Sequence, residues 1–197
     1  MFIELVDALR CPHAHEESWL VLGADRLDGR DVVAGVLGCP VCRARYEIAN
    51  GVADLRAAPA APPAPRRGPA ADPDQALRLA AFLGLADAGG YAVLVGDWTA
   101  QAAALRALVE PHLFVVNPVS GVPSGAGISG ILADTGLPLA AGRARALAVD
   151  ASVDGERLLR AVETLRPGGR LVAPARLPVP AGVTELARDE AVWVAER

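Results

Sequence analysis

Two short segments, CPHAH and CPVC, hold the residues best suited to bind a metal ion. Zinc takes four cysteine or histidine ligands in a tetrahedron, and two short loops can supply them in pairs. Cys39 and Cys42, at CxxC spacing, form one pair. Cys11 begins an equivalent turn, but Ala14 stands where its second cysteine would lie, with a histidine on each side.

We expect His15 to replace the missing thiolate because it has the reach, with His13 as the alternative. The predicted ligands of a structural zinc ion are therefore Cys11, His15, Cys39 and Cys42. An odd number of cysteines with a CxxC pair favours metal over a disulfide. In the competing interpretation there is no metal site. The three cysteines are then small hydrophobic residues of the core, and the histidines near them are exposed. A domain this small would have little core without a metal.

The stretch VLVGDWTA places a glycine turn after a buried strand, as in cofactor-binding α/β domains. It holds one glycine, Gly96, and a tryptophan, Trp98, in the middle of the turn. One interpretation is a capping acid, Asp97, beside a core tryptophan. The other is a reshaped pocket for a different small ligand.

A proline- and alanine-rich stretch at 57–71 predicts an extended linker between two domains, 1–56 and 72–197. Before it, the pattern predicts a short helix and β-hairpins. After it, strands alternate with helices, beginning with a helix that Asp72 caps and Pro73 opens. This alternation predicts a mostly parallel sheet.

The expected elements after the linker follow from apolar runs and turn residues. One helix is expected to begin at a capping Asp154 and to end in a Gly-Gly turn at Gly168 and Gly169. His112 is expected on the surface, just past a helix end. The final segment is expected to form a strand or hairpin. The predicted strands are 91–96, 113–117, 130–134, 145–151 and 170–175, and the predicted helices that follow the first one are 99–110 and 154–169.

The first 56 residues resemble a known zinc-ribbon family. LVDALRCP…GCPVCRARYEIANGVADLR resembles the activator subunit of tRNA, rRNA and release-factor methyltransferases. In that family a helix leads into a Cys-Pro knuckle, and a second knuckle precedes an aromatic-x-Ile strand and an Asn-Gly turn. Ala14 departs from the four-cysteine pattern. The resemblance implies a non-catalytic module that binds and stabilises a methyltransferase-fold domain.

The remainder resembles class I S-adenosylmethionine-dependent methyltransferases. LRPGGRLV is similar to their junction between a helix and strand five. Asp134, Leu137 and Pro138 stand where the family has an acid ending strand three and a Leu-Pro pair. The resemblance implies an α/β fold, with a Rossmann-like, mostly parallel sheet and helices on both faces, after the small zinc-ribbon β domain.

The same resemblance implies a cofactor cleft that this chain has altered. The family's Gly-x-Gly-x-Gly turn keeps only its first glycine here, and Asn117 replaces the acid that accepts the ribose hydroxyls. A Gly/Ser/Pro loop follows where the family has a helix. We expect no S-adenosylmethionine binding and assign no catalytic residue. The positions of this vestigial cleft are Gly96, Asp97, Trp98, Asn117 and Asp134.

These patterns predict a scaffold or partner-binding protein rather than an enzyme. The expected partner is a methyltransferase-fold protein or another copy of the chain. The alternative is an active S-adenosylmethionine-dependent methyltransferase with a divergent turn, and the third hypothesis is an RNA-binding ribbon.

Charge and hydropathy narrow the classes of partner. The net charge of −4 is spread evenly, without the basic stripe of a nucleic-acid binder. No apolar run approaches the roughly 18–20 residues that span a bilayer. The first residues lack the layout of a secretion signal, so we expect a cytoplasmic protein. All 19 basic residues are arginine, which is typical of GC-rich bacterial genomes.

Overall fold

The structure is a computed structural model that describes residues 1–57, 66–86, 89–134 and 136–197. Its N-terminal part confirms the predicted hairpins, whereas the expected first helix is a 3-10 helix. The elements of this part are η1 (Ile3–Ala8), β1 (Val21–Asp28), β2 (Asp31–Gly38), β3 (Arg45–Ala49) and β4 (Val52–Asp54).

The C-terminal part alternates strands and helices only in places, because β6, β7 and β8 follow one another without a helix among their described residues. The helix expected over 99–110 is shorter, because the chain first makes a 3-10 turn and then five residues of α-helix. The elements are α1 (Pro73–Leu83), β5 (Tyr91–Val95), η2 (Gly96–Gln101), α2 (Ala102–Arg106), β6 (His112–Val116), β7 (Ile128–Leu132), β8 (Ala144–Ala148), α3 (Gly155–Thr164), β9 (Leu165–Pro174), β10 (Thr184–Arg188) and β11 (Val192–Glu196).

Capping residues set the start of both longer helices. The Asp72 side chain accepts backbone N–H bonds at the start of α1, with Pro73 in the first helical position, and Gly84 ends the helix in the left-handed region. Asp154 accepts the backbone N–H of Arg157 and starts α3. Both predicted caps are confirmed.

The predicted Gly-Gly end of α3 is wrong. The helix ends at Thr164, and the chain passes straight into β9, so that both glycines lie inside the strand. Gly168 has a φ of +73° and the register to β8 shifts here. A Cβ on Gly169 would lie 2.8 Å from the carbonyl oxygen of Arg166. The glycines therefore serve an irregular strand rather than a turn.

The sheet is a mixed one with a parallel centre. In the described part of the chain eleven strands pair in the order β1-β2-β3-β4-β7-β6-β5-β8-β9-β11-β10. Strands β7, β6, β5, β8 and β9 are parallel, in the order of a doubly wound fold. The final segment is a hairpin, and β11 pairs antiparallel with β9.

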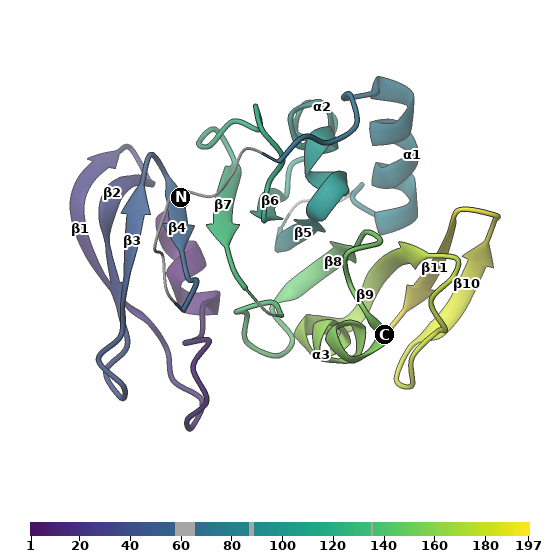
Figure 1. Ribbon diagram of the computed structural model, residues 1–197. Coiled ribbons are helices and arrows are strands. Elements are labelled where there is room, and N and C mark those ends of the chain that lie inside the picture. Colours follow the sequence, from purple (N-terminus) through teal and green to yellow (C-terminus); the bar gives the residue numbers. More distant parts are fainter. Residues whose placement is uncertain (58–65, 87–88, 135) are drawn as a thin grey trace.

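The central strands are buried on both faces, as parallel strands usually are. Ala92 and Leu94 face a core shared with α1 and α2, whereas Val93, Val95 and Phe114 face a core shared with α3 and the N-terminal part. Figure 1 shows α1 and α2 on one side of the sheet and α3 on the other.

The N-terminal strands join the parallel sheet directly, because β4 pairs with β7. Ala140 donates its N–H to the carbonyl of Ala8, and Arg10 donates its N–H to the carbonyl of Pro138. The connections on either side of β7 contain no helix among their described residues. The N-terminal segment therefore fills a face of the core that a crossover helix would otherwise cover. The domain boundaries given above stay predictions, and residues 58–65 of the linker lie outside the described residues.

His112 is not a surface residue as expected. It is the first residue of β6, half-buried, and its ring stacks on Phe2 with centroids 3.9 Å apart. Burial, followed by the nearby positive charge of Arg106, lowers the pKa of His112. Across the described ranges, no helix combines the length and apolar character needed to cross a membrane.

Candidate metal centre and carboxyl edge of the sheet

Two loops present the side chains that were predicted to bind a metal ion. The first loop is closed by the N–H of Cys11, which donates to the carbonyl of Ser18 at 3.0 Å. The second connects β2 to β3. There Cys39 donates its N–H to Ala44 at 2.9 Å, and Arg43, with a φ of +61°, donates its N–H to the carbonyl of Cys39. Backbone bonds thus fix both loops without using the thiols.

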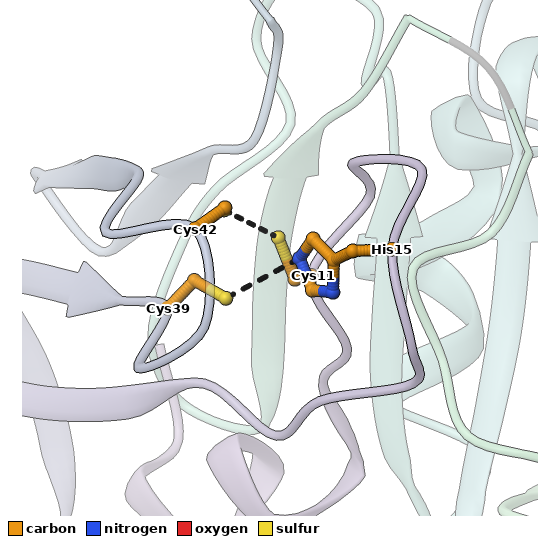
Figure 2. Close-up of side chains that lie close together, drawn as sticks. All are labelled: Cys11, His15, Cys39 and Cys42. Atoms are coloured by element: carbon orange, nitrogen blue, oxygen red, sulfur yellow. Dashed lines mark hydrogen bonds between the residues drawn. The ribbon is translucent and has the colours of Figure 1, made fainter.

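The four predicted ligands lie together at the tips of these loops. The ligand atoms of Cys11, His15, Cys39 and Cys42 all lie within 4.8 Å of one another. The sulfurs of Cys11 and Cys42 are 3.7 Å apart, and the Cys39 sulfur is 3.4 Å from Nε2 of His15 (Figure 2). Thiolates bound tetrahedrally at about 2.3 Å from zinc lie about 3.8 Å apart, so this donor set fits zinc.

The two histidines take different places. His15 has Nδ1 at 2.5 Å from the carbonyl oxygen of Glu16, which fixes the proton on Nδ1 and leaves the Nε2 lone pair free for a metal. His13 lies outside the four-residue group and has Nδ1 at 3.5 Å from the Cys42 sulfur. This arrangement favours His15 as the ligand.

The thiols have different acidities. Burial raises the pKa of Cys39, but hydrogen bonds from the backbone N–H groups of Cys42 and Val41 outweigh it and bring the pKa to about 6. Burial raises the pKa of Cys11. The lowered pKa favours the thiolate form of Cys39, which is the form that binds metals.

A second polar cluster lies at the carboxyl edge of the sheet, where β5 enters its glycine turn. Gly96 has a φ of +64°, and a Cβ built on it would lie 2.1 Å from Oδ2 of Asp150. The backbone N–H of Asp97 donates to the same oxygen at 2.7 Å. The side chain that meets the turn is therefore the acid that follows β8, not Trp98.

Asp150 is held by donors from three segments. Arg66 donates to it at 3.1 Å and to Asp97 at 2.8 Å, and the N–H of Ser152 donates to its second oxygen at 2.9 Å. Only 8% of Asp150 is exposed. Burial raises its pKa, but the bonds from Ser152, the Asp97 N–H and Arg66 outweigh burial and hold the pKa below its usual value. Asp150 is thus a paired, buried carboxylate.

The other side chains of the turn are also bonded internally. Trp98 donates its indole N–H to the carbonyl of Val149 at 3.1 Å and packs against the core on the α1 and α2 side. The buried hydroxyl of Thr99 donates to the carbonyl of Gly96 at 2.6 Å. The buried Gln101 amide donates to Gln75 at 2.7 Å. The polar groups of these three side chains are therefore used in hydrogen bonds within the protein.

Asn117 and Asp134 also make internal contacts. Asn117 has a φ of +52°, a conformation that asparagine tolerates better than most residues. Its amide donates to the carbonyl of Ala133 and accepts the N–H of Ala133, both at 2.9 Å, and so joins the ends of β6 and β7. Asp134 accepts the N–H of Ala57 at 2.8 Å.

A cavity of about 50 Å³ lies at this edge, beside Asn117 and Asp134 and under α3. It sits where the strand order reverses, which is the usual ligand position in doubly wound sheets. The predicted positions therefore divide: Asn117 and Asp134 line the cavity, while Gly96, Asp97 and Trp98 belong to the cluster around Asp150.

Sequence reasoning missed Asp150, Ser152 and Arg66. Asp150 directly follows a buried strand, and the carboxyl ends of parallel strands meet at one edge. That position was the available signal for Asp150 and its neighbour Ser152. No sequence signal marks Arg66, because it reaches the site from the segment read as a linker.

Comparisons with known proteins find structural neighbours only. No protein-family model matches the sequence, and no curated protein matches it. Among solved structures, a putative S-adenosyl-L-methionine-dependent methyltransferase from Methanococcus maripaludis is similar at 11% identity, over 63% of this chain and 83% of that one, with a TM-score of 0.46. A SAM-dependent methyltransferase from Aquifex aeolicus is similar at 13% identity, over 63% and 87%, with a TM-score of 0.45.

A putative SAM-dependent methyltransferase from Streptococcus mutans is similar at 12% identity and a TM-score of 0.40, over 63% of this chain; the match spans 49% of that longer chain. The neighbours are thus S-adenosylmethionine-dependent methyltransferases. Likeness at this level establishes neither a family nor an activity for this chain.

Proposed function

We propose that this chain is a non-catalytic scaffold or partner-binding protein, in which a zinc-stabilised ribbon supports a methyltransferase-like domain with a lost cofactor site. The observation that carries the proposal is the contact of the Asp150 carboxylate with Gly96 and the Asp97 N–H. Free N–H groups at such a turn receive the cofactor in doubly wound folds. Here the N–H of Asp97 is bonded to the chain's own carboxylate, which supports the loss of the cofactor site.

Entry of a ligand would require displacing this carboxylate. A buried charge that loses its partners costs roughly 3–5 kcal/mol. Arg66 would lose its bond to Asp150 in the same step. A cofactor would have to supply that energy before gaining net affinity, which supports the loss of S-adenosylmethionine binding.

The remaining cavity supports the same proposal. Its volume of about 50 Å³ is well below the roughly 300–1,000 Å³ of ligand pockets. At about 10–15 Å³ for each water, it holds a few water molecules. Its apolar walls, such as Val95 and Val149, come from strand ends in the core, so that widening it would disturb packing.

The metal centre fits a structural zinc ion. Four cysteine and histidine ligands close the coordination sphere, so zinc would supply cross-links between two loops rather than an open catalytic position. The ribbon would then hold Leu5 and Leu9 of the N-terminal segment against the core it shares with the parallel sheet. On this proposal the zinc stabilises the whole domain.

The edge strand β1 is the surface we propose for the partner, a methyltransferase-fold protein or another copy of the chain. Seven of its eight residues are exposed, and among the described strands it pairs only with β2. An exposed strand edge offers N–H and C=O groups to a further strand. Light scattering over a range of protein concentrations tests self-pairing, and a mass that stays monomeric excludes it.

Titration calorimetry with S-adenosylmethionine and its demethylated product tests the lost cofactor site. We expect no heat at millimolar ligand. Binding in the micromolar range would overturn the proposal in favour of an active methyltransferase. Asp150→Ala is the informative variant, since a gain of binding would identify the carboxylate as the block. Elemental analysis should find about one zinc per chain, lost in Cys39→Ser.

A further inference from the structure

We propose that Tyr46 and His13 are positioning residues for the metal centre, each donating a hydrogen bond to one thiolate. Tyr46 would donate to Cys11 and His13 to Cys42. The inference rests on the proposed zinc site and adds to it. It assigns His13 a role other than that of an alternative ligand.

Tyr46 is placed for this role by the ribbon. It lies on β3 with 3% of its surface exposed, and its hydroxyl oxygen is 3.3 Å from the Cys11 sulfur. A buried tyrosine hydroxyl needs a hydrogen-bond partner. A zinc-bound thiolate carries no proton, so the hydroxyl must be the donor.

His13 occupies the equivalent place beside Cys42. Its Nδ1 lies 3.5 Å from the Cys42 sulfur, and its ring meets the Tyr46 ring edge-on, with centroids 6.1 Å apart. The two rings are therefore in contact with each other, and each lies next to one sulfur, that of Cys11 for Tyr46 and that of Cys42 for His13. The third thiolate, Cys39, has backbone donors in its own loop.

Hydrogen bonds to the sulfurs matter because three thiolates bring three negative charges to one divalent ion. Donors that point at a charged acceptor form the stronger class of hydrogen bond and orient the ligand. Loss of such partners around metal ligands lowers metal affinity about 10- to 100-fold. A lost ligand changes the coordination itself. Measurements of zinc affinity and of the ligand set therefore distinguish a lost hydrogen-bond donor from a lost ligand.

The test replaces zinc with cobalt, whose absorption reports the ligand set, and measures zinc affinity by competition with a chromophoric chelator. Tyr46→Phe and His13→Phe keep the rings and remove the donors. We expect each to lower zinc affinity about 10- to 100-fold while the cobalt spectrum keeps its three-sulfur, one-nitrogen form. His15→Phe should change that spectrum. Tyr91→Phe, on β5, is the matched control and should alter neither measurement.

Two outcomes overturn the assignment. Unchanged zinc affinity in Tyr46→Phe and His13→Phe refutes the donor roles. A changed cobalt spectrum in His13→Phe, with a normal one in His15→Phe, makes His13 the ligand instead. Wild-type protein that binds neither zinc nor cobalt refutes the zinc site itself, which separates failure of the proposed function from failure of this inference. Circular dichroism of each variant at saturating zinc confirms that it is folded.

Discussion

The carboxylate of Asp150 lies directly against Gly96, where a Cβ would come within 2.1 Å of its Oδ2. Gly96→Ala should therefore destabilise the fold twice, through the clash and through about 1–2 kcal/mol of left-handed backbone strain. Gly142→Ala is the matched control, since Gly142 has a φ of +70° and nothing within 4 Å of a Cβ. Urea denaturation should show the larger loss for Gly96→Ala. Equal losses would argue against the close contact.

Adding Asp150→Ala to Gly96→Ala should recover part of that loss, because the smaller side chain leaves room for the new methyl group. The double-mutant cycle measures the coupling between the two positions. Strictly additive effects on the free energy of unfolding would contradict the contact.

Asn117→Asp should destabilise the protein rather than restore a cofactor site. An aspartate cannot donate to the carbonyl of Ala133, which Asn117 bonds at 2.9 Å. We expect a loss of about 1–3 kcal/mol in the free energy of unfolding, the usual cost of an unsatisfied buried group. Thermal denaturation checks this. A neutral or stabilising effect would show that the hydrogen bonds between Asn117 and Ala133 do not hold the ends of β6 and β7 together.

His112 should make stability depend on pH. Its native pKa is lowered by burial and by Arg106, so the unfolded chain takes up a proton that the native chain does not. Stability should therefore fall as the pH drops below about 6.5, the ordinary histidine value, until the lower native pKa is reached. His112→Phe keeps a ring against Phe2 and should lose this part of the slope. Identical slopes at saturating zinc would contradict the lowered pKa.

Zinc removal should destabilise the whole chain in one transition, because the N-terminal segment and the parallel sheet share a core. A ligand at about 1,000 times its Kd contributes about 4 kcal/mol. Calorimetry with and without a chelator should show one peak moving to lower temperature. Two peaks, of which only one responds to zinc, would mean that the ribbon folds independently.

Local features of the fold were predictable from the sequence, and contacts between distant segments were not. Asp72 and Asp154 revealed the helix starts because a cap acts on its own neighbours. The metal ligands were predictable because their spacing reflects loop geometry. Asp150 and Arg66 meet across 84 residues, and no local pattern encodes that encounter. Gly168 led to a wrong prediction of the helix end because glycine is found in irregular strands as well as in turns.

Continuity between the ribbon and the parallel sheet depends on a very short strand. Strand β4 has three residues, and Val52 lies opposite Gly130 of β7, where a Cβ would come within 3.0 Å of the valine side chain. The valine on one segment thus fills the space left by the glycine on the other. A side chain at position 130 would therefore have to displace Val52, so we expect the size of the residue on one segment to limit the size of its partner on the other.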